Sequence, residues 1–160
     1  MNLITSSPSL TVTSASFKKT REIGQILSQT ISKGISIGLL GELGAGKTQF
    51  VKGIARGLNI DEDEVVSPSF GLINEYKGDT NLYHVDLYRL DAREEIDTLG
   101  LEDYFGGDGI VVVEWAERLH ESDLALFDIL VKFRIISENQ RDIIFYGDLS
   151  PSFTEITRNL

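Results

Sequence analysis

Apolar residues recur at helical spacing in two long segments of this chain. The first begins after Ser14 or Ser16, either of which can cap a helix, and runs to about Ser32. Its expected inward side chains are Phe17, Ile23, Ile26, Leu27 and Ile31. The second covers residues 49–58, with expected inward side chains Phe50, Val51, Ile54 and Leu58. The spacing therefore predicts two amphipathic helices, and a shorter one is expected over 94–99.

Other apolar positions alternate with polar ones or run without interruption, as in strands. Segments of this kind cover 9–13, 35–40, 72–76, 82–88, 128–135 and 141–146. The continuous run at 110–113 indicates a strand buried on both faces of a sheet. Lys77-Gly78-Asp79 is typical of a hairpin turn, and a polar turn separates the last two alternating segments. Together the elements predict an α/β fold whose mixed sheet has a parallel centre, antiparallel strands and helices on both faces.

The segment between the strand at 35–40 and the helix at 49–58 carries the most specific motif. Residues 41–48 read GELGAGKT, a full match to the phosphate-binding pattern G-x-x-x-x-G-K-[ST]. Its glycines let backbone N–H groups curl around a phosphate, its lysine reaches the β- and γ-phosphates, and its hydroxyl can bind Mg²⁺. The following helix adds its dipole. The motif predicts that a nucleoside triphosphate is bound by Glu42, Leu43, Gly44, Ala45, Gly46, Lys47 and Thr48.

A chain of 160 residues, 41% hydrophobic and 25% charged, is long enough for one well-buried core. We therefore expect a single P-loop domain over 1–160. Its expected parts are an N-terminal strand and helix (9–33), a nucleotide core (35–120), a C-terminal antiparallel hairpin (124–147) and a tail (148–160).

Two carboxylates are expected at strand ends beside this loop. Asp86 follows Leu82–Val85, and Glu114 follows the buried run at 110–113. Ligands of open α/β sheets bind at the carboxyl edge, and hydrolysis needs acids near the Mg²⁺ and the attacking water. Exposed strand-end charge or helix capping is the alternative. We interpret Asp86 and Glu114 as catalytic acids and, with Thr48, as metal ligands, leaving open which acid contacts the metal more directly.

Two further side chains are weaker candidates for contact with the phosphates. Ser69 lies in the break at 67–70, where GTPase-like folds place a hydroxyl that senses the γ-phosphate. Arg89 is placed to stabilise phosphate charge, or to pair with Asp91 or Glu94. Both are predicted to bind the nucleotide.

The same region contains side chains with no assigned role. His84, Asp86 and Tyr88 would share one side of a strand, a pattern that is also common on exposed surfaces. Trp115, the only tryptophan, is expected to pack in the core or an interface rather than to stack on a base.

The composition narrows the partners and the compartment. A net charge of −10 and a pI near 4.6 disfavour direct, tight nucleic-acid binding, and leave open an acidic face that docks on a basic protein. Zero cysteines exclude disulfides and thiolate ligands. With no apolar run of membrane-spanning length and no signal core at the N-terminus, we expect a cytoplasmic protein.

Four blocks of the chain, in order and spacing, resemble the bacterial TsaE family of tRNA threonylcarbamoyladenosine biosynthesis ATPases. They are GELGAGKT at 41–48, SPSF at 67–70, HVDLYR at 84–89 and VEWAER at 113–118. The resemblance implies a weak ATPase with ATP and Mg²⁺ as cofactors, which acts on a TsaB–TsaD assembly and supports its turnover. That set of proteins builds the threonylcarbamoyl group on adenosine beside the anticodon of tRNAs reading A-starting codons. This chain would meet tRNA only through the complex.

The resemblance also implies roles for individual residues. Thr48 and Asp86 would act around Mg²⁺, Glu114 would be the catalytic or metal-shell acid, and Ser69 would lie in a switch-like segment. The family usually has threonine where this chain has Ser69. The hydroxyl is kept, but the methyl group that restrains the side-chain rotamer is lost.

Two alternatives share the phosphate loop. A small-molecule kinase needs a lid that brings arginines over the phosphates, and the arginines here are thinly spread. A nucleotide-gated binding module with negligible hydrolysis shares the whole site, and the sequence does not separate it from a slow ATPase. A regulatory GTPase is disfavoured because the chain has no N-K-x-D segment for reading guanine.

Overall fold

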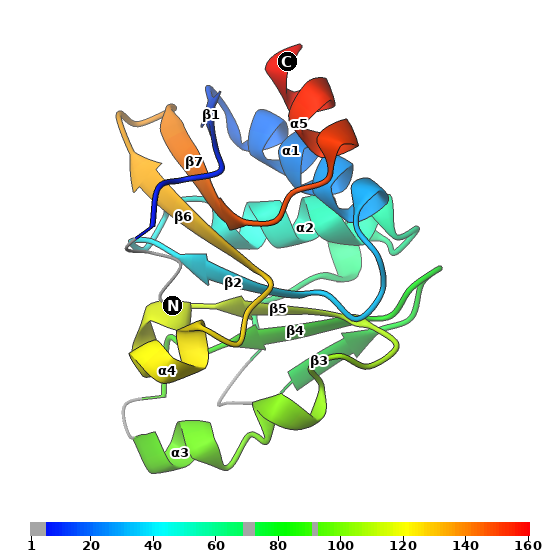
Figure 1. The fold of residues 1–160 in the computed structure, drawn as a ribbon, viewed down its shortest axis with the longest axis vertical. Coiled ribbons are helices and arrows are strands. Elements are labelled where there is room, and N and C mark those ends of the chain that lie inside the picture. Colours follow the sequence, from blue (N-terminus) through cyan, green and yellow to red (C-terminus); the bar gives the residue numbers. More distant parts are fainter. Residues whose placement is uncertain (1–5, 69–72, 91–92) are drawn as a thin grey trace.

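The local sequence patterns produce alternating strands and helices over most of the chain. The structure, a computed structural model, describes residues 6–68, 73–90 and 93–160 (Figure 1). Its strands are β1 (Leu10–Ser14), β2 (Ser36–Leu40), β3 (Ile73–Tyr76), β4 (Leu82–Asp86), β5 (Ile110–Glu114), β6 (Ile129–Ile135) and β7 (Arg141–Gly147). Its α-helices are α1 (Phe17–Thr30), α2 (Lys47–Gly57), α3 (Arg93–Asp97), α4 (Glu121–Leu124) and α5 (Pro151–Arg158). Short 3₁₀ turns are η2 (Glu62–Glu64), η3 (Leu101–Asp103) and η4 (Ala116–Arg118).

The seven strands form one mixed sheet in the order β1-β7-β6-β2-β5-β4-β3. The four inner strands β6, β2, β5 and β4 run parallel, whereas β1, β7 and β3 are antiparallel to their neighbours. The predicted mixed sheet with a parallel centre is thus confirmed. Because the chain re-enters the sheet in parallel strands, the carboxyl ends of β2, β4 and β5 lie at one edge.

Helices cover both faces of the sheet, as predicted. On one face, α1, α2 and α5 pack with Ile37, Leu39 and Val112, while Val111 and Val113 point to the other face. This alternation is the period-two geometry of a strand. The second face is covered by α3, η3, η4 and α4, which lie on the opposite side in Figure 1. None of the described helices is both long and apolar enough to cross a membrane.

Helix α2, which carries the phosphate-loop lysine, is held very close to α1. A Cβ built on Gly53 would lie 1.9 Å from the backbone oxygen of Arg21, and one on Gly24 would lie 2.4 Å from that of Phe50. Only glycine permits this approach of the two helix backbones. The packing fixes the start of α2 relative to the rest of the domain.

Several expectations need correction. Phe17 is not inward but 43% exposed, and its ring lies near Gly46 of the phosphate loop and against the guanidinium of Arg141. Of the two serines expected as possible caps, Ser16 is the one that caps this helix. Strand β4 ends at Asp86, so Tyr88 lies beyond it. The segment called a tail contains α5, whose N-cap Ser150 accepts from the Phe153 amide.

Candidate nucleotide site at the carboxyl edge of the sheet

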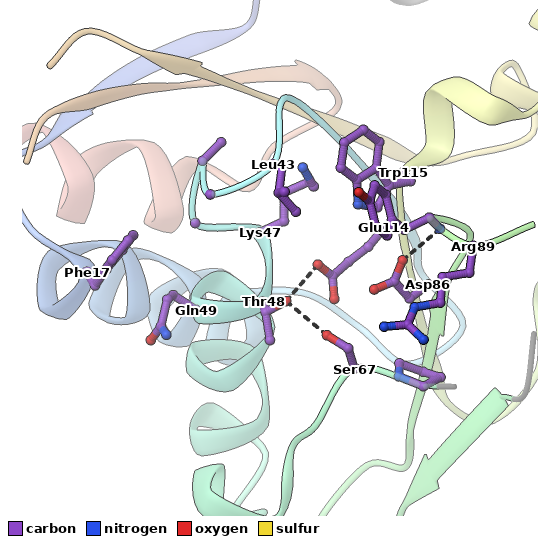
Figure 2. Close-up of a pocket in the computed structure, with 15 residues that line it drawn as sticks. Phe17, Leu43, Lys47, Thr48, Gln49, Ser67, Asp86, Arg89, Glu114 and Trp115 are labelled. Carbon is purple, nitrogen blue, oxygen red and sulfur yellow. Dashed lines mark hydrogen bonds between the residues drawn. The ribbon is translucent and has the colours of Figure 1, made fainter. Parts of the chain in front are cut away.

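The phosphate loop, β4 and β5 enclose a cavity of about 470 Å³ at the carboxyl edge of the sheet. Gly44 and Gly46 adopt φ values of +80° and +105°, a region that side-chain-bearing residues rarely occupy. The loop can therefore curl before α2 begins at Lys47. Figure 2 shows the side chains that line the cavity. They belong to Phe17, Leu43, Gly44, Ala45, Gly46, Lys47, Thr48, Gln49, Ser67, Pro68, Asp86, Tyr88, Arg89, Glu114 and Trp115.

Lys47 is almost fully buried and folds against its own loop. Its Nζ donates to the carbonyl oxygens of Gly41 and Glu42, the latter at 2.9 Å, and lies 4.0 Å from the centre of the Trp115 ring. Burial lowers the pKa of Lys47 from its ordinary value, and surrounding carboxylates, led by Glu117, oppose that shift. The ammonium group is thus held inside the site by carbonyl dipoles and an aromatic face.

Glu114 connects the sheet to the start of α2. The Thr48 hydroxyl donates to its Oε1 at 2.9 Å, and its Oε2 lies 2.5 Å from Nε2 of His84. The side chains of His84 and Glu114 are 0% and 2% exposed. Thr48 also lies 3.4 Å from the Ser67 hydroxyl, longer than a usual O–H···O bond. The carboxylate is fixed at both oxygens (Figure 2 shows the Thr48 contacts).

Asp86 lies in register with Glu114 on the adjacent parallel strand, so the two carboxylates end their strands side by side. Its Oδ1 accepts from the backbone N–H of Tyr88 at 2.9 Å. Burial raises the pKa of Asp86 above its ordinary value, with a smaller upward contribution from Glu114. A cation between the loop and these strand ends would favour the ionised form.

The residues after β5 turn back onto the phosphate loop. Trp115 has φ of +60°, an uncommon value for a residue with a side chain, and its ring packs 4.9 Å from that of Tyr88. Two residues on, Glu117 Oε2 accepts from the backbone N–H of Gly41 at 2.9 Å. Strand end and loop are therefore tied together at several points.

Most of the residues predicted to bind nucleotide come together. Leu43 to Thr48, Asp86, Arg89 and Glu114 all line the cavity, and Figure 2 shows Arg89 extending into it near Asp86. Glu42 lines a neighbouring groove instead and offers its carbonyl to Lys47. Ser69 lies outside the described residues.

Several contributors to the site were not predicted from the sequence. Phe17 and Ser67 line the cavity, and Glu117 holds the loop. His84, which shared its pattern with exposed strands, is buried against Glu114. Trp115 packs on Tyr88 and Lys47 and lines the cavity. For His84 and Glu117, the density of polar residues at 84–89 and 114–118 was the available signal.

The residue types fit a magnesium ion that is shared with a nucleotide. Among the described residues, no group of three or more histidines and acids is placed to hold a metal by itself. Mg²⁺ rarely needs such a cage, because it keeps several waters and binds through one or two carboxylates plus substrate phosphates. The Thr48 hydroxyl, Glu114 and Asp86 supply that set.

Comparison with known proteins places this geometry in a family. The model of the family described as threonylcarbamoyl adenosine biosynthesis protein TsaE matches residues 14–145. The chain belongs to the TsaE family.

The relatives support the TsaE assignment along most of their length. A protein of Treponema pallidum named tRNA threonylcarbamoyladenosine biosynthesis protein TsaE is 38% identical over 130 residues, which cover 81% of this chain and 95% of the relative. A protein of the same name from Nostoc is 41% identical, over 79% of this chain and 80% of its own. The crystal structure of Bacillus subtilis YdiB is similar, with a TM-score of 0.67 and 30% identity, over 94% of this chain and 91% of that one. The resemblance to TsaE is confirmed.

Proposed function

We propose that this chain is a Mg²⁺-dependent ATPase that supports formation of the threonylcarbamoyl group on the adenosine beside the anticodon in tRNAs reading A-starting codons. Family membership and the names of its relatives support the tRNA pathway. The observation that carries the ATPase proposal is the 2.9 Å bond between Thr48 and Glu114, at the point where a phosphate loop meets a strand end.

ATP is held chiefly through its phosphates. Residues 43–46 of the loop and the N-terminus of α2 line the cavity, and Lys47 would supply the cation for the β- and γ-phosphates. Phe17 and Gln49 line the cavity beside the loop, where an aromatic face is available to the nucleoside.

The Thr48 hydroxyl, Asp86 and Glu114 would hold Mg²⁺, which when bound neutralises developing charge on the phosphate oxygens. Asp86 is suited to this position because its burial makes an ionised, unpaired carboxylate costly. Glu114 would also orient the attacking water and accept its proton.

The arrangement favours slow turnover by the chain alone. Both oxygens of Glu114 already accept hydrogen bonds, one from Thr48 and one from His84. Each oxygen keeps a second lone pair and can still accept from water, but the bond from Thr48 makes Oε1 a weaker base until Thr48 shifts. A partner assembly that promotes this shift would control the reaction, and we infer that TsaB and TsaD form it in the cytoplasm. With a net charge of −10, the chain would meet tRNA only through that assembly.

Phosphate release from Mg²⁺-ATP, measured with and without purified TsaB and TsaD, tests the proposal. We expect weak release that increases with the pair and is absent from Lys47→Ala. Release no greater than that of this control under either condition would refute the ATPase proposal and favour a nucleotide-gated module. Transfer of the γ-phosphate to a small molecule instead of water would favour a kinase. Co-purification with the TsaB–TsaD pair in ATP and in ADP tests the partner assignment separately.

A further inference from the structure

The side chain of His84 lies between the sheet and α2, directly behind the site. In the parallel register of β4 and β5, His84 pairs with Val112 and Asp86 with Glu114. Residues two apart on a strand share a face, so His84 is on the same face as both acids. It therefore approaches Glu114 from inside the core, opposite the cavity that Glu114 lines.

The hydrogen bonds of His84 fix which ring nitrogen carries the proton. Nε2 lies 2.5 Å from Glu114 Oε2, and Nδ1 is buried with no hydrogen-bond partner among the described residues. A proton on Nδ1 would be a buried donor without an acceptor, whereas a bare Nδ1 is less costly. The arrangement is satisfied when the neutral ring carries its proton on Nε2 and donates to Glu114.

We propose that His84 positions Glu114 for the proposed ATP hydrolysis, on which this inference rests. By occupying Oε2 from the core side, His84 leaves Oε1 as the oxygen that faces Thr48 and the cavity. Without this donor, a buried carboxylate can rotate, and either oxygen can turn toward α2. Residues that orient metal-site carboxylates in this way change affinity or activity by about 10- to 100-fold when they are replaced.

Two substitutions separate positioning from packing. His84→Gln keeps an N–H donor that can reach Glu114, whereas His84→Met fills a similar volume without a donor. We expect His84→Met to lower ATP turnover by about 10- to 100-fold while ATP affinity changes less than about threefold. His84→Gln should recover most of that loss. His120→Gln, a change at the exposed second histidine, is the matched control.

Nitrogen-15 NMR of the nucleotide-free protein tests the geometry without any turnover. The chain has two histidines, and His120→Gln assigns the remaining ring signal to His84. We expect a single neutral tautomer with a slowly exchanging Nε2 proton, which changes in Glu114→Ala.

Three results would overturn the proposal: a neutral ring whose proton is on Nδ1 and not on Nε2, a rapidly exchanging ring, or equal turnover of the Gln and Met variants. Thermal unfolding of both variants identifies loss of fold, and if His84→Met does not fold, the ring signal of the unsubstituted protein still decides. If the unsubstituted chain does not hydrolyse ATP at all, the proposed function fails, while the NMR result continues to decide the position of His84.

Discussion

Two substitutions of Glu114 should separate its catalytic contribution from its structural one. Glutamine keeps the shape of the side chain: its oxygen can accept from His84, and its NH₂ can donate to the Thr48 hydroxyl, which is able to accept as well as donate. Alanine removes both contacts. It leaves Nε2–H of His84 buried without an acceptor, whereas Thr48 faces the cavity and can bond to water.

The contacts set the expected magnitudes. A buried donor left without a partner costs about 1–3 kcal/mol. For a domain of this length, each kcal/mol lowers the unfolding midpoint by about 2–4 °C. We therefore expect Glu114→Ala to unfold about 2–12 °C lower than the unsubstituted chain, and Glu114→Gln to stay within about 1 kcal/mol of it. Both should lose about 10²- to 10⁴-fold in hydrolysis, the usual contribution of a general base.

Three measurements on the same preparations check this reasoning: thermal unfolding without nucleotide, ATP affinity by calorimetry, and phosphate release in the presence of TsaB and TsaD. Glu114→Gln should bind ATP nearly as well as the unsubstituted chain does. Hydrolysis by Glu114→Gln at more than a tenth of the normal rate would refute the assignment of Glu114 as the base. Parallel loss of ATP affinity and hydrolysis in this variant would instead make Glu114 a binding residue.

Three further predictions follow from contacts of the nucleotide-free protein. Lys47→Met removes the cation that faces the phosphates and should weaken ATP binding about 10- to 100-fold in calorimetry, since a charged hydrogen bond contributes about 1.5–3 kcal/mol; unchanged affinity would exclude the loop as the phosphate site. Burial raises the pKa of Asp86 above 3.8, so the folded protein favours the protonated side chain. The stability that this protonation adds is present in acid and is lost as pH rises from 3.8 through the raised value. Asp86→Asn should therefore unfold at a higher temperature than the unsubstituted chain at pH 7 but not in acid, and it should lose the Mg²⁺-dependent part of ATP affinity; a lower midpoint at pH 7 would contradict this. Gly53→Ala places a Cβ 1.9 Å from the Arg21 oxygen and should cost at least about 1–3 kcal/mol in chemical denaturation, although alanine favours helix. Gly107→Ala, whose nearest contact would be 3.5 Å away, is its control, and equal effects of the two would refute the close-packing argument.

Sequence patterns located the phosphate loop, Asp86 and Glu114 because these depend on short-range signals. The loop motif fixes its own backbone, and an acid after a buried strand must lie at the carboxyl edge of a parallel sheet. Helix α5 also had a local signal, a serine cap followed by proline, but the helix is short and contains few apolar residues.

The burial of His84 could not be predicted from the spacing of residues along the strand. A polar residue alternating with apolar ones has the same pattern whether its side meets water or another element. Its burial depends on β4 lying next to β5 with α2 packed above, which is a contact between distant parts of the chain. The prediction for Phe17 was wrong in the opposite direction: helical spacing places it inward, but its ring lies beside the phosphate loop and is 43% exposed.

The phosphate loop of this chain is not an independent unit, because three residues of the segment 114–117 contact it. A strand end that met the loop only through its acid could move without changing the lysine or the first glycine of the loop. Here any shift of segment 114–117 changes the cation, the hydroxyl and the loop backbone together. A protein that docks near this segment can therefore alter nucleotide binding and hydrolysis without reaching the phosphates, as the proposed dependence on TsaB and TsaD requires. The contacts that carry this coupling are Gly41 with Glu117, Lys47 with Trp115, and Thr48 with Glu114.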